Sequence, residues 1–381
     1  MNKNRTWHQR GAAAIVLTAA LGLVLAGCGS SETSADPGSG GGGASKVSLD
    51  ADYAGTFGTP PTKGPAVAKG ANVWAVICSS VAAGCQEPAT ALAEAGDELG
   101  WKVTIADGKF GVGDGYNVAI RQAIAAKADA IVLFGIDCAM APAALKDAKD
   151  AGITTVNSGG FECQDTPIFT ASLQWNEQDP DFTGWLQATG AAKARWLIDA
   201  TDGKANVIIQ DDIDSQLPVN IVKGFTDEMK AKCPGCTTKR MKFSGQDIQN
   251  GVFAQKFSAA LVANPTANAV VCPLDTFCQT SNVVAATAST GRKITIVGGE
   301  GLADTTEAIR TGKINAAQGW DSGWAGYATA DVVNRALAGT DQVPQGLGFQ
   351  TVDTDHNLPK KGPYTSSVDY KSAYRTLWNL S

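Results

Sequence analysis

Residues 128–138 read ADAIVLFGIDC, and this stretch decides the fold of the chain. Its apolar part, residues 130–135, has the length and composition typical of a strand that is buried on both faces. Stretches in which apolar residues recur at helical spacing flank it, at 116–126 and at 141–151. A strand between two such helices is the repeating unit of a parallel sheet covered by helices, so the stretch predicts an α/β protein.

The same alternation continues outward in both directions. Further strands are expected at 72–78, 101–106 and 154–157, and then at 206–210, 237–243, 269–272 and 294–298, with helices between them. Two successive series of this kind predict two doubly wound parallel-sheet lobes. The chain after residue 70, about 310 residues, also exceeds the usual size of a single core.

The N-terminus has the layout of a secretory signal. Three basic residues precede an apolar run over 11–24, which is shorter than the roughly 20 residues of a membrane-spanning helix. We therefore expect residues 1–27 to be a cleaved signal peptide. An ordinary signal peptide with an incidental cysteine at position 28 is the alternative.

Cys28 and the three residues before it, Leu25-Ala26-Gly27, resemble the lipobox of bacterial lipoproteins. The resemblance implies that Cys28 is acylated, which would hold the protein to the outer face of the cytoplasmic membrane. Residues 28–70 are rich in Gly, Ser, Pro and Thr. They are predicted to form a flexible tether.

The charge of the exported chain argues against nucleic acid as a partner. Without its first 27 residues the chain carries 28 basic and 37 acidic side chains, a net charge of −9. Phosphate backbones are bound by clustered Lys and Arg, and the sequence has no such cluster. We expect a monomer that binds a small molecule.

Eight cysteines besides Cys28 indicate disulfides in an exported protein. The expected pairs are Cys78 with Cys85, Cys138 with Cys163, Cys233 with Cys236, and Cys272 with Cys278. A metal site or a redox CxxC motif is the alternative. With only one histidine after the signal peptide and no spacing of paired zinc knuckles, we expect neither metal nor cofactor.

Ligands of open parallel sheets bind beyond the carboxyl ends of the strands. The loops at these ends are 79–86, 136–138, 157–161, 211–220, 274–277 and 299–301. Gln86 and Asp137 are candidate ligand contacts in the first two. Three of the expected disulfides would stiffen these loops, which suits a preorganised site.

An ordered set of landmarks resembles the sugar-binding branch of the type I periplasmic binding proteins. The landmarks are Gly100-Trp101, 128–133, 151–153, Lys223-Gly224-Phe225, 297–301 and Gly312-Lys313-Ile314, and the likeness covers about 71–338. It implies lobes joined by a three-strand hinge, with crossings near 171–172, 320–321 and 342–344. The first lobe would comprise 71–171 and 321–342, the second 172–320 and 343–381.

The resemblance also implies site residues. Asn157 and Glu300 occupy positions where the family has hydroxyl-binding Asp or Asn, and Asp275 lies one position beyond a usual Asn. Asn220 is the candidate where the family often has an arginine. At the second crossing Trp320 replaces a polar residue, and Asp321 follows it.

Aromatic residues near the expected cleft fit a sugar, whose apolar CH faces stack on aromatic rings. Phe161, Trp175 and Trp320 are the candidates. For each of them, packing in the core is the alternative. Acidic candidates outnumber basic ones. A cationic or amino-bearing ligand is therefore an alternative to a neutral sugar, and an anionic ligand is not expected.

These observations predict an extracytoplasmic substrate-binding lipoprotein that delivers a small polar solute, foremost a sugar, to the permease and ATPase of an ABC importer. A lipoprotein that senses the ligand for a membrane receptor is one alternative. An enzyme is not expected, because one histidine gives no Ser-His-Asp set and there is no Walker loop or HExxH motif. A glycosidase that uses a pair of carboxylates is the remaining alternative.

Overall fold

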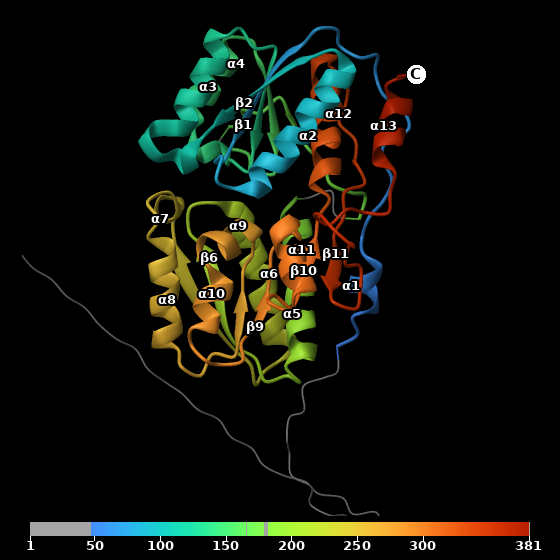
Figure 1. The fold of residues 1–381 in the computed structure, drawn as a ribbon. Coiled ribbons are helices and arrows are strands. Elements are labelled where there is room, and N and C mark those ends of the chain that lie inside the picture. The colour runs from blue at the N-terminus through green and yellow to red at the C-terminus, as the bar shows by residue number, and fades with distance from the viewer. Residues whose placement is uncertain (1–46, 165, 179–181, 381) are drawn as a thin grey trace, which may run out of the picture. The chain divides into compact units, whose positions relative to one another are not determined.

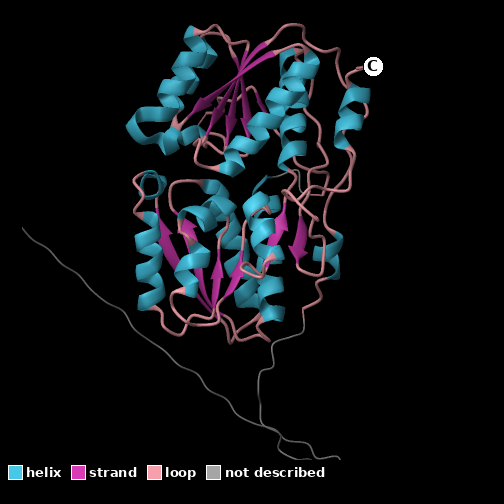
Figure 2. Cartoon of the chain, viewed as in Figure 1, coloured by secondary structure: helices cyan, strands magenta, loops and turns pink. Residues whose placement is uncertain are grey.

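The structure is a computed structural model that describes residues 47–164, 166–178 and 182–380. Two sheets, each with helices on both faces, make up the described chain (Figure 1 and Figure 2). This arrangement confirms the predicted α/β fold with two lobes. The expected signal peptide and Cys28 lie outside the described residues. Among the helices that are described, none has both the length and the apolar character needed to span a membrane.

The first lobe is built on a parallel sheet of order β2-β1-β3-β4-β5. The strands are β1 (Asn72–Ile77), β2 (Lys102–Asp107), β3 (Ala130–Phe134), β4 (Thr154–Ser158) and β5 (Ala171–Ser172). Alternate residues of β3 point to opposite faces: Val132 packs with the helices α2 (Ala83–Leu99) and α12 (Ser322–Leu337), and Ile131 packs with α3 (Gly115–Ala125) and α4 (Pro142–Asp150). The short 3-10 helices η1 (Lys109–Asp114) and η2 (Cys138–Met140) follow β2 and β3.

The second lobe has the sheet order β11-β10-β9-β8-β6-β7, in which β11 is antiparallel to β10. The strands are β6 (Asn206–Asp212), β7 (Thr237–Phe243), β8 (Ala269–Val271), β9 (Thr295–Val297), β10 (Ala316–Gly319) and β11 (Gln350–Asp353). One face packs with α5 (Phe182–Ala200) and α6 (Gln216–Lys232). The other packs with α8 (Phe253–Ala263), α9 (Asp275–Thr280), α10 (Val283–Ala288) and α11 (Ala303–Arg310), and α7 (Gly245–Gln249) follows β7.

The chain passes between the lobes after β5, after β10 and before β11, close to the three predicted crossings. The first and third crossings pair with each other. The N–H of Gln345 donates to the carbonyl of Gln174 at 3.0 Å, and the N–H of Leu347 donates to the carbonyl of Trp175 at 2.8 Å. The lobes are therefore joined by hydrogen-bonded extended segments.

Residues 47–71 form a segment that we call the N-terminal strap. It begins with α1 (Asp50–Ala54), where the buried Asp52 binds the guanidinium of Arg195 in the second lobe at 2.6 and 2.8 Å. The strap then runs along the third crossing, where the N–H of Gly58 donates to the carbonyl of Gly346 at 2.9 Å. It reaches the first lobe where the indole of Trp101 donates to the carbonyl of Ala68 at 2.6 Å.

The strap corrects the prediction that residues 28–70 form a flexible tether, because residues 47–70 belong to the folded body. The Gly-, Pro- and Thr-rich composition of this segment did not indicate that it would be folded. The strap is held by backbone hydrogen bonds and an ion pair, and these leave no apolar periodicity in the sequence.

The C-terminal helix α13 (Tyr370–Leu377) lies against α12 of the first lobe, although its sequence segment was assigned to the second lobe. Tyr374 and Trp378 are buried in the first lobe's core, and Arg375 binds Glu98 of α2 at 2.9 and 2.6 Å. The chain thus returns to the first lobe after β11, which the predicted boundaries omit.

All four predicted disulfides are present, joining Cys78 to Cys85, Cys138 to Cys163, Cys233 to Cys236 and Cys272 to Cys278. Cys138 and Cys163 follow β3 and β4, which are neighbours in the sheet. The ends of adjacent parallel strands bring the two side chains within bonding range.

Candidate functional site

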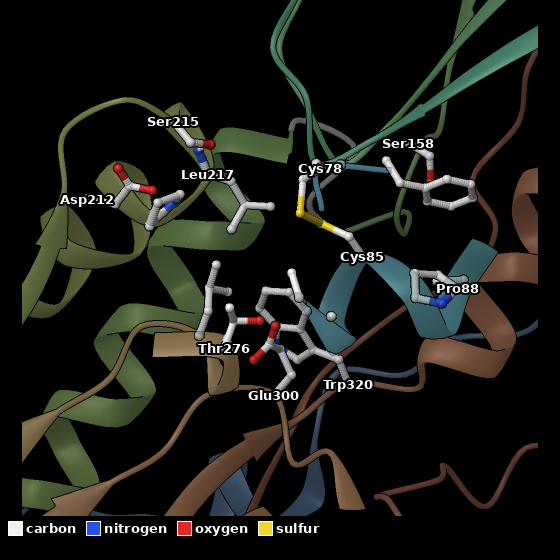
Figure 3. A pocket seen from close by; sticks show the side chains of 18 of the residues that line it. Cys78, Cys85, Pro88, Ser158, Asp212, Ser215, Leu217, Thr276, Glu300 and Trp320 are labelled. Carbon is white, nitrogen blue, oxygen red and sulfur yellow. Dashed lines mark hydrogen bonds between the residues drawn. A yellow bond between two sulfur atoms is a disulfide. The ribbon is translucent and has the colours of Figure 1, made fainter. Parts of the chain in front are cut away.

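A cavity of about 560 Å³ lies between the two lobes (Figure 3). Loops at the carboxyl ends of strands from both sheets line it, as the rule for open parallel sheets predicts. The first lobe contributes residues that follow β1, β2, β3 and β4, and the second contributes residues that follow β6, β7, β8, β9 and β10. The volume falls within the range of about 300–1,000 Å³ typical of small-molecule sites.

Four of the ten predicted ligand contacts line this cavity: Trp175, Glu300, Trp320 and Asp321. The other six, Gln86, Asp137, Asn157, Phe161, Asn220 and Asp275, lie outside its lining. The structure therefore brings together the predicted contacts of the hinge and of the loop after β9. The side chains of the other six have partners elsewhere in the protein.

Three of these six side chains form hydrogen bonds within their own loop or helix, and Asn220 also accepts from the side-chain amide of Gln187 in α5 at 3.2 Å. The amide of Asn157 turns back to Gly160, donating to its carbonyl and accepting from its N–H, both at 2.8 Å. Asn220 donates to the carbonyl of Gln216 one helical turn earlier. Gln86 donates to the side-chain hydroxyl of Thr90, one helical turn later, at 3.2 Å.

The remaining three have structural contacts. The ring of Phe161 packs against Phe182 with centroids 5.5 Å apart. Asp137 accepts hydrogen bonds from two backbone N–H groups. Asp275 is fully buried and accepts from the N–H groups of Gly299 and Leu302, both at 2.7 Å.

Aromatic rings form the wall of the cavity next to the hinge. Trp175 and Trp320 both line the cavity, with centroids 6.5 Å apart. Each also packs on the fully buried Trp185, at 4.5 and 4.8 Å respectively. Their orientation is therefore fixed by the core, and they present rigid apolar surface to the cavity.

Glu300 projects into the cavity from the loop after β9 and is 4% exposed. One of its carboxylate oxygens accepts a hydrogen bond from the backbone N–H of Asp275. The other, Oε1, faces Gly84 at the start of α2 in the opposite lobe, where an added Cβ would lie 2.7 Å from it. Burial and the nearby carboxylate of Asp275 raise the pKa of Glu300.

Lys193 anchors the loop that carries Glu300. The sequence did not indicate Lys193 as a residue of the site. It is fully buried in α5, and its Nζ donates to the carbonyls of Gly298 at 2.6 Å and Gly299 at 2.8 Å. Its ammonium also offsets part of the negative charge of Asp275 and Glu300. A lysine among the apolar residues of a helix was the available signal.

Asp212, at the end of β6, was not among the predicted ligand contacts, although the loop that contains it was predicted to lie at the site. It is 6% exposed and lines the cavity. One carboxylate oxygen accepts from the N–H of Asp214 at 3.0 Å, and the other has no hydrogen-bond partner among the described residues. Burial raises the pKa of Asp212 to about 7, and the charge of Asp214 adds to the effect.

The lining includes four carboxylates but no Lys, Arg or His among the described residues. Asp321 uses both oxygens, accepting from the N–H groups of Trp324 and Ser366, whereas Asp214 is exposed and accepts from the N–H of Gly245 through one oxygen. Asp212 and Glu300 retain the oxygens that face the cavity. The site can thus accept hydrogen bonds from hydroxyl or ammonium groups.

One cluster of potential metal ligands is present in the described part of the chain, formed by Cys138, Glu162 and Cys163. The two sulfurs are joined in a disulfide. Glu162 accepts hydrogen bonds from the N–H groups of Cys163, Ile168 and Phe169. These groups satisfy one another, so the cluster does not suit a metal ion.

Two α/β lobes joined by paired hinge segments, with a polar and aromatic cavity between them, define a two-lobed small-molecule binding protein. A model of the family described as the periplasmic binding protein domain matches residues 76–341, well over half of the chain. The chain belongs to this family, whose members are extracytoplasmic binding proteins. No curated relative matches the chain at a significant level.

Solved structures share the fold at low identity. An ABC transporter solute binding protein from Mycobacterium smegmatis with bound glycerol is 16% identical, with a TM-score of 0.65 over 78% of this chain and 100% of that one. A solute binding protein from Agrobacterium vitis bound with α-D-tagatopyranose is 18% identical, with a TM-score of 0.63 over 77% and 99%. A galactofuranose binding protein is 18% identical, with a TM-score of 0.61 over 81% and 99%.

Proposed function

We propose that this chain is the solute-binding component of an ABC importer and that it captures a sugar or a related polyhydroxylated solute in the cavity between its lobes. The observation that carries the proposal is the pairing of free carboxylate oxygens with fixed indole rings on that cavity. Asp212 and Glu300 would accept hydrogen bonds from hydroxyl groups. Trp175 and Trp320 would cover the apolar face of the ring.

Binding would favour the closed arrangement of the lobes, because a solute in the cavity contacts loops of both. A ligand shifts an equilibrium between open and closed forms by its difference in affinity for the two. The closed form would then be recognised by the permease, which works with its ATPase. The solved relatives with bound sugars or polyols support this role.

A library of sugars, polyols, nucleosides and amino acids tests the ligand class by thermal shift. A solute that binds only the folded protein, at a concentration of 100 Kd, stabilises it by about 2.7 kcal/mol. We expect sugars or polyols, and their substituted forms, to raise the melting temperature. Trp320→Ala should lose most of this shift. Stabilisation by amino acids or nucleosides alone would contradict the proposal.

The proposal includes a lipid anchor at Cys28, on the basis of the lipobox resemblance. Cys28→Ser should release the protein from the membrane fraction and abolish labelling by a fatty-acid probe. Membrane association that survives this substitution would contradict the anchor. The proposal also includes the absence of catalysis, so chromatography should recover every ligand unchanged after long incubation with the protein.

A further inference from the structure

The two ends of the cavity differ in whether a cation lies near their buried carboxylate. This difference bears on the charge of the solute that the cavity can bind. Asp212 ends β6 and Glu300 follows β9, and both strands flank β8. Two strand spacings place these ends about 10 Å apart. A single ring with its substituents can therefore reach from one carboxylate to the other.

The Glu300 end contains one buried cation, Lys193, which is shared between the carboxylates of Glu300 and Asp275. Lys193 lies behind the loop and, through the carbonyls of Gly298 and Gly299, is close enough for its charge to act on Glu300 and Asp275. Trp320 adjoins this end, because its backbone N–H donates to the carbonyl of Glu300 at 2.9 Å, and its side chain lines the cavity. This end suits the neutral, hydroxylated part of a solute.

The Asp212 end has no such compensation among the described residues. The carboxylates that act on Asp212 are those of Asp214, Asp211 and Asp137. Arg240, the cation that the described structure pairs with these carboxylates, is used by Asp211 in a two-bond ion pair at 2.8 and 2.9 Å. The ring of Tyr116, which also lines the cavity, adds a phenol but no positive charge.

A buried carboxylate without a cation is costly in its ionised form. A hydroxyl group of a ligand satisfies one hydrogen bond of Asp212 and leaves its charge uncompensated. An ammonium group supplies both the hydrogen bond and the charge, and such charge-assisted bonds are roughly twice as strong as neutral ones.

We propose that the cavity is built for a solute that carries a positively charged amino group as well as hydroxyls, with the ammonium at Asp212 and the hydroxylated ring between Glu300 and Trp320. This inference rests on the proposed function and narrows its ligand class. Amino sugars and amino cyclitols are the chemical class that fits both ends.

Calorimetry with matched solutes tests the inference. The panel contains hexoses, pentoses and cyclitols, each as the parent polyol, as the primary amine and as the N-acetylated amine. We expect the amines to bind at least about tenfold more tightly than their neutral counterparts at pH 7. Neutral members that bind as tightly as the amines, or more tightly, would overturn the inference and leave the proposed function intact. If no member binds at all, the proposed function itself fails.

Asp212→Asn separates the charge from the shape of the site. The preference for amines should disappear in this variant, whereas Asp355→Asn, which removes an exposed carboxylate outside the cavity lining, should keep it. A second readout needs only the wild-type protein. Amine binding should release protons near pH 7, seen as a dependence of the heat on the ionisation enthalpy of the buffer. Amine binding without proton release, or an unchanged preference in Asp212→Asn, would contradict the assignment.

Discussion

Asp137 and Gln216 link the two lobes across the cleft through a hydrogen bond of 2.8 Å. The acceptor is a carboxylate oxygen in the loop after β3, and the donor is the first backbone N–H of α6 in the second lobe. The other carboxylate oxygen of Asp137 accepts from the N–H of Phe161 within the first lobe at 3.0 Å. A carboxylate at a helix N-terminus is favoured by the helix dipole, so this contact stabilises the arrangement in which the lobes meet.

Asp137→Ala should weaken ligand binding by favouring separated lobes. A hydrogen bond to a charged group contributes about 1.5–3 kcal/mol, so we expect the dissociation constant to rise roughly 10- to 100-fold. Calorimetry measures the affinity, and small-angle scattering measures compaction on binding. The folded signal in circular dichroism should persist, because each lobe keeps its own core. Wild-type affinity in this variant would show that the contact has no part in closure.

Gly84→Ala should hinder closure by steric contact. The new Cβ would lie 2.7 Å from Oε1 of Glu300 in the opposite lobe, which is too close for the present arrangement. We expect at least about tenfold weaker binding, a change of 1.4 kcal/mol, with little change in the melting temperature of the ligand-free protein. Gly235→Ala is the matched control, because an added Cβ there meets no atom within 4 Å and its φ is not positive. Equal affinities of the two variants would contradict this reading of the cleft.

The ligand-free protein should be more stable at pH 5.5 than at pH 7.5. Burial raises the pKa of Asp137 to about 6 and that of Asp212 to about 7. In this range the native state binds more protons than the unfolded chain, so the free energy of unfolding falls as the pH rises. Asp212 alone should contribute about 2 kcal/mol of this difference.

Urea denaturation at the two pH values measures the effect, and Asp212→Asn should reduce it. The range stops at pH 7.5 because burial lowers the pKa of Lys193 to about 8, and this group contributes with the opposite sign at higher pH. A free energy of unfolding that increases from pH 5.5 to pH 7.5 would contradict the assignment of buried, uncompensated carboxyls.

The four disulfides should differ in their effect on stability. Cys138 and Cys163 are 25 residues apart, whereas Cys233 and Cys236 are 3 apart. Chain entropy then predicts a loss of about 3.5 kcal/mol when the first pair is replaced by alanine and about 1.6 kcal/mol for the second. Chemical denaturation of the two double variants makes the comparison. A larger loss for the short loop would show that native packing, not loop length, dominates.

Much of this fold could be predicted from residues close together in sequence. The run at 128–138 became β3, buried on both faces, with the predicted helices on either side. The disulfides were also predictable, because most of the pairs enclose short loops. The loops around the cavity followed from the rule that parallel strands end at one edge.

Individual contacts within those loops were less predictable. A loop can be placed from its strand, but the direction of a side chain within it depends on local hydrogen bonds. The amide of Asn157 is used by Gly160, while Asp212, in another predicted loop, faces the cavity. Nothing in the spacing of these residues distinguishes the two outcomes.

The sequence by itself determined the α/β class, the two lobes and the edge at which they meet, because these depend on periodic apolar burial. Only the tertiary structure decided where the N-terminal strap and α13 lie, and which carboxylates face the cavity. The strap is held by Asp52 and Arg195, which are 143 positions apart in the chain. The charge on Asp212 is uncompensated because Arg240 is bound to its neighbour Asp211. Such ion pairs depend on which distant residues the fold brings together, so they cannot be predicted from the local sequence.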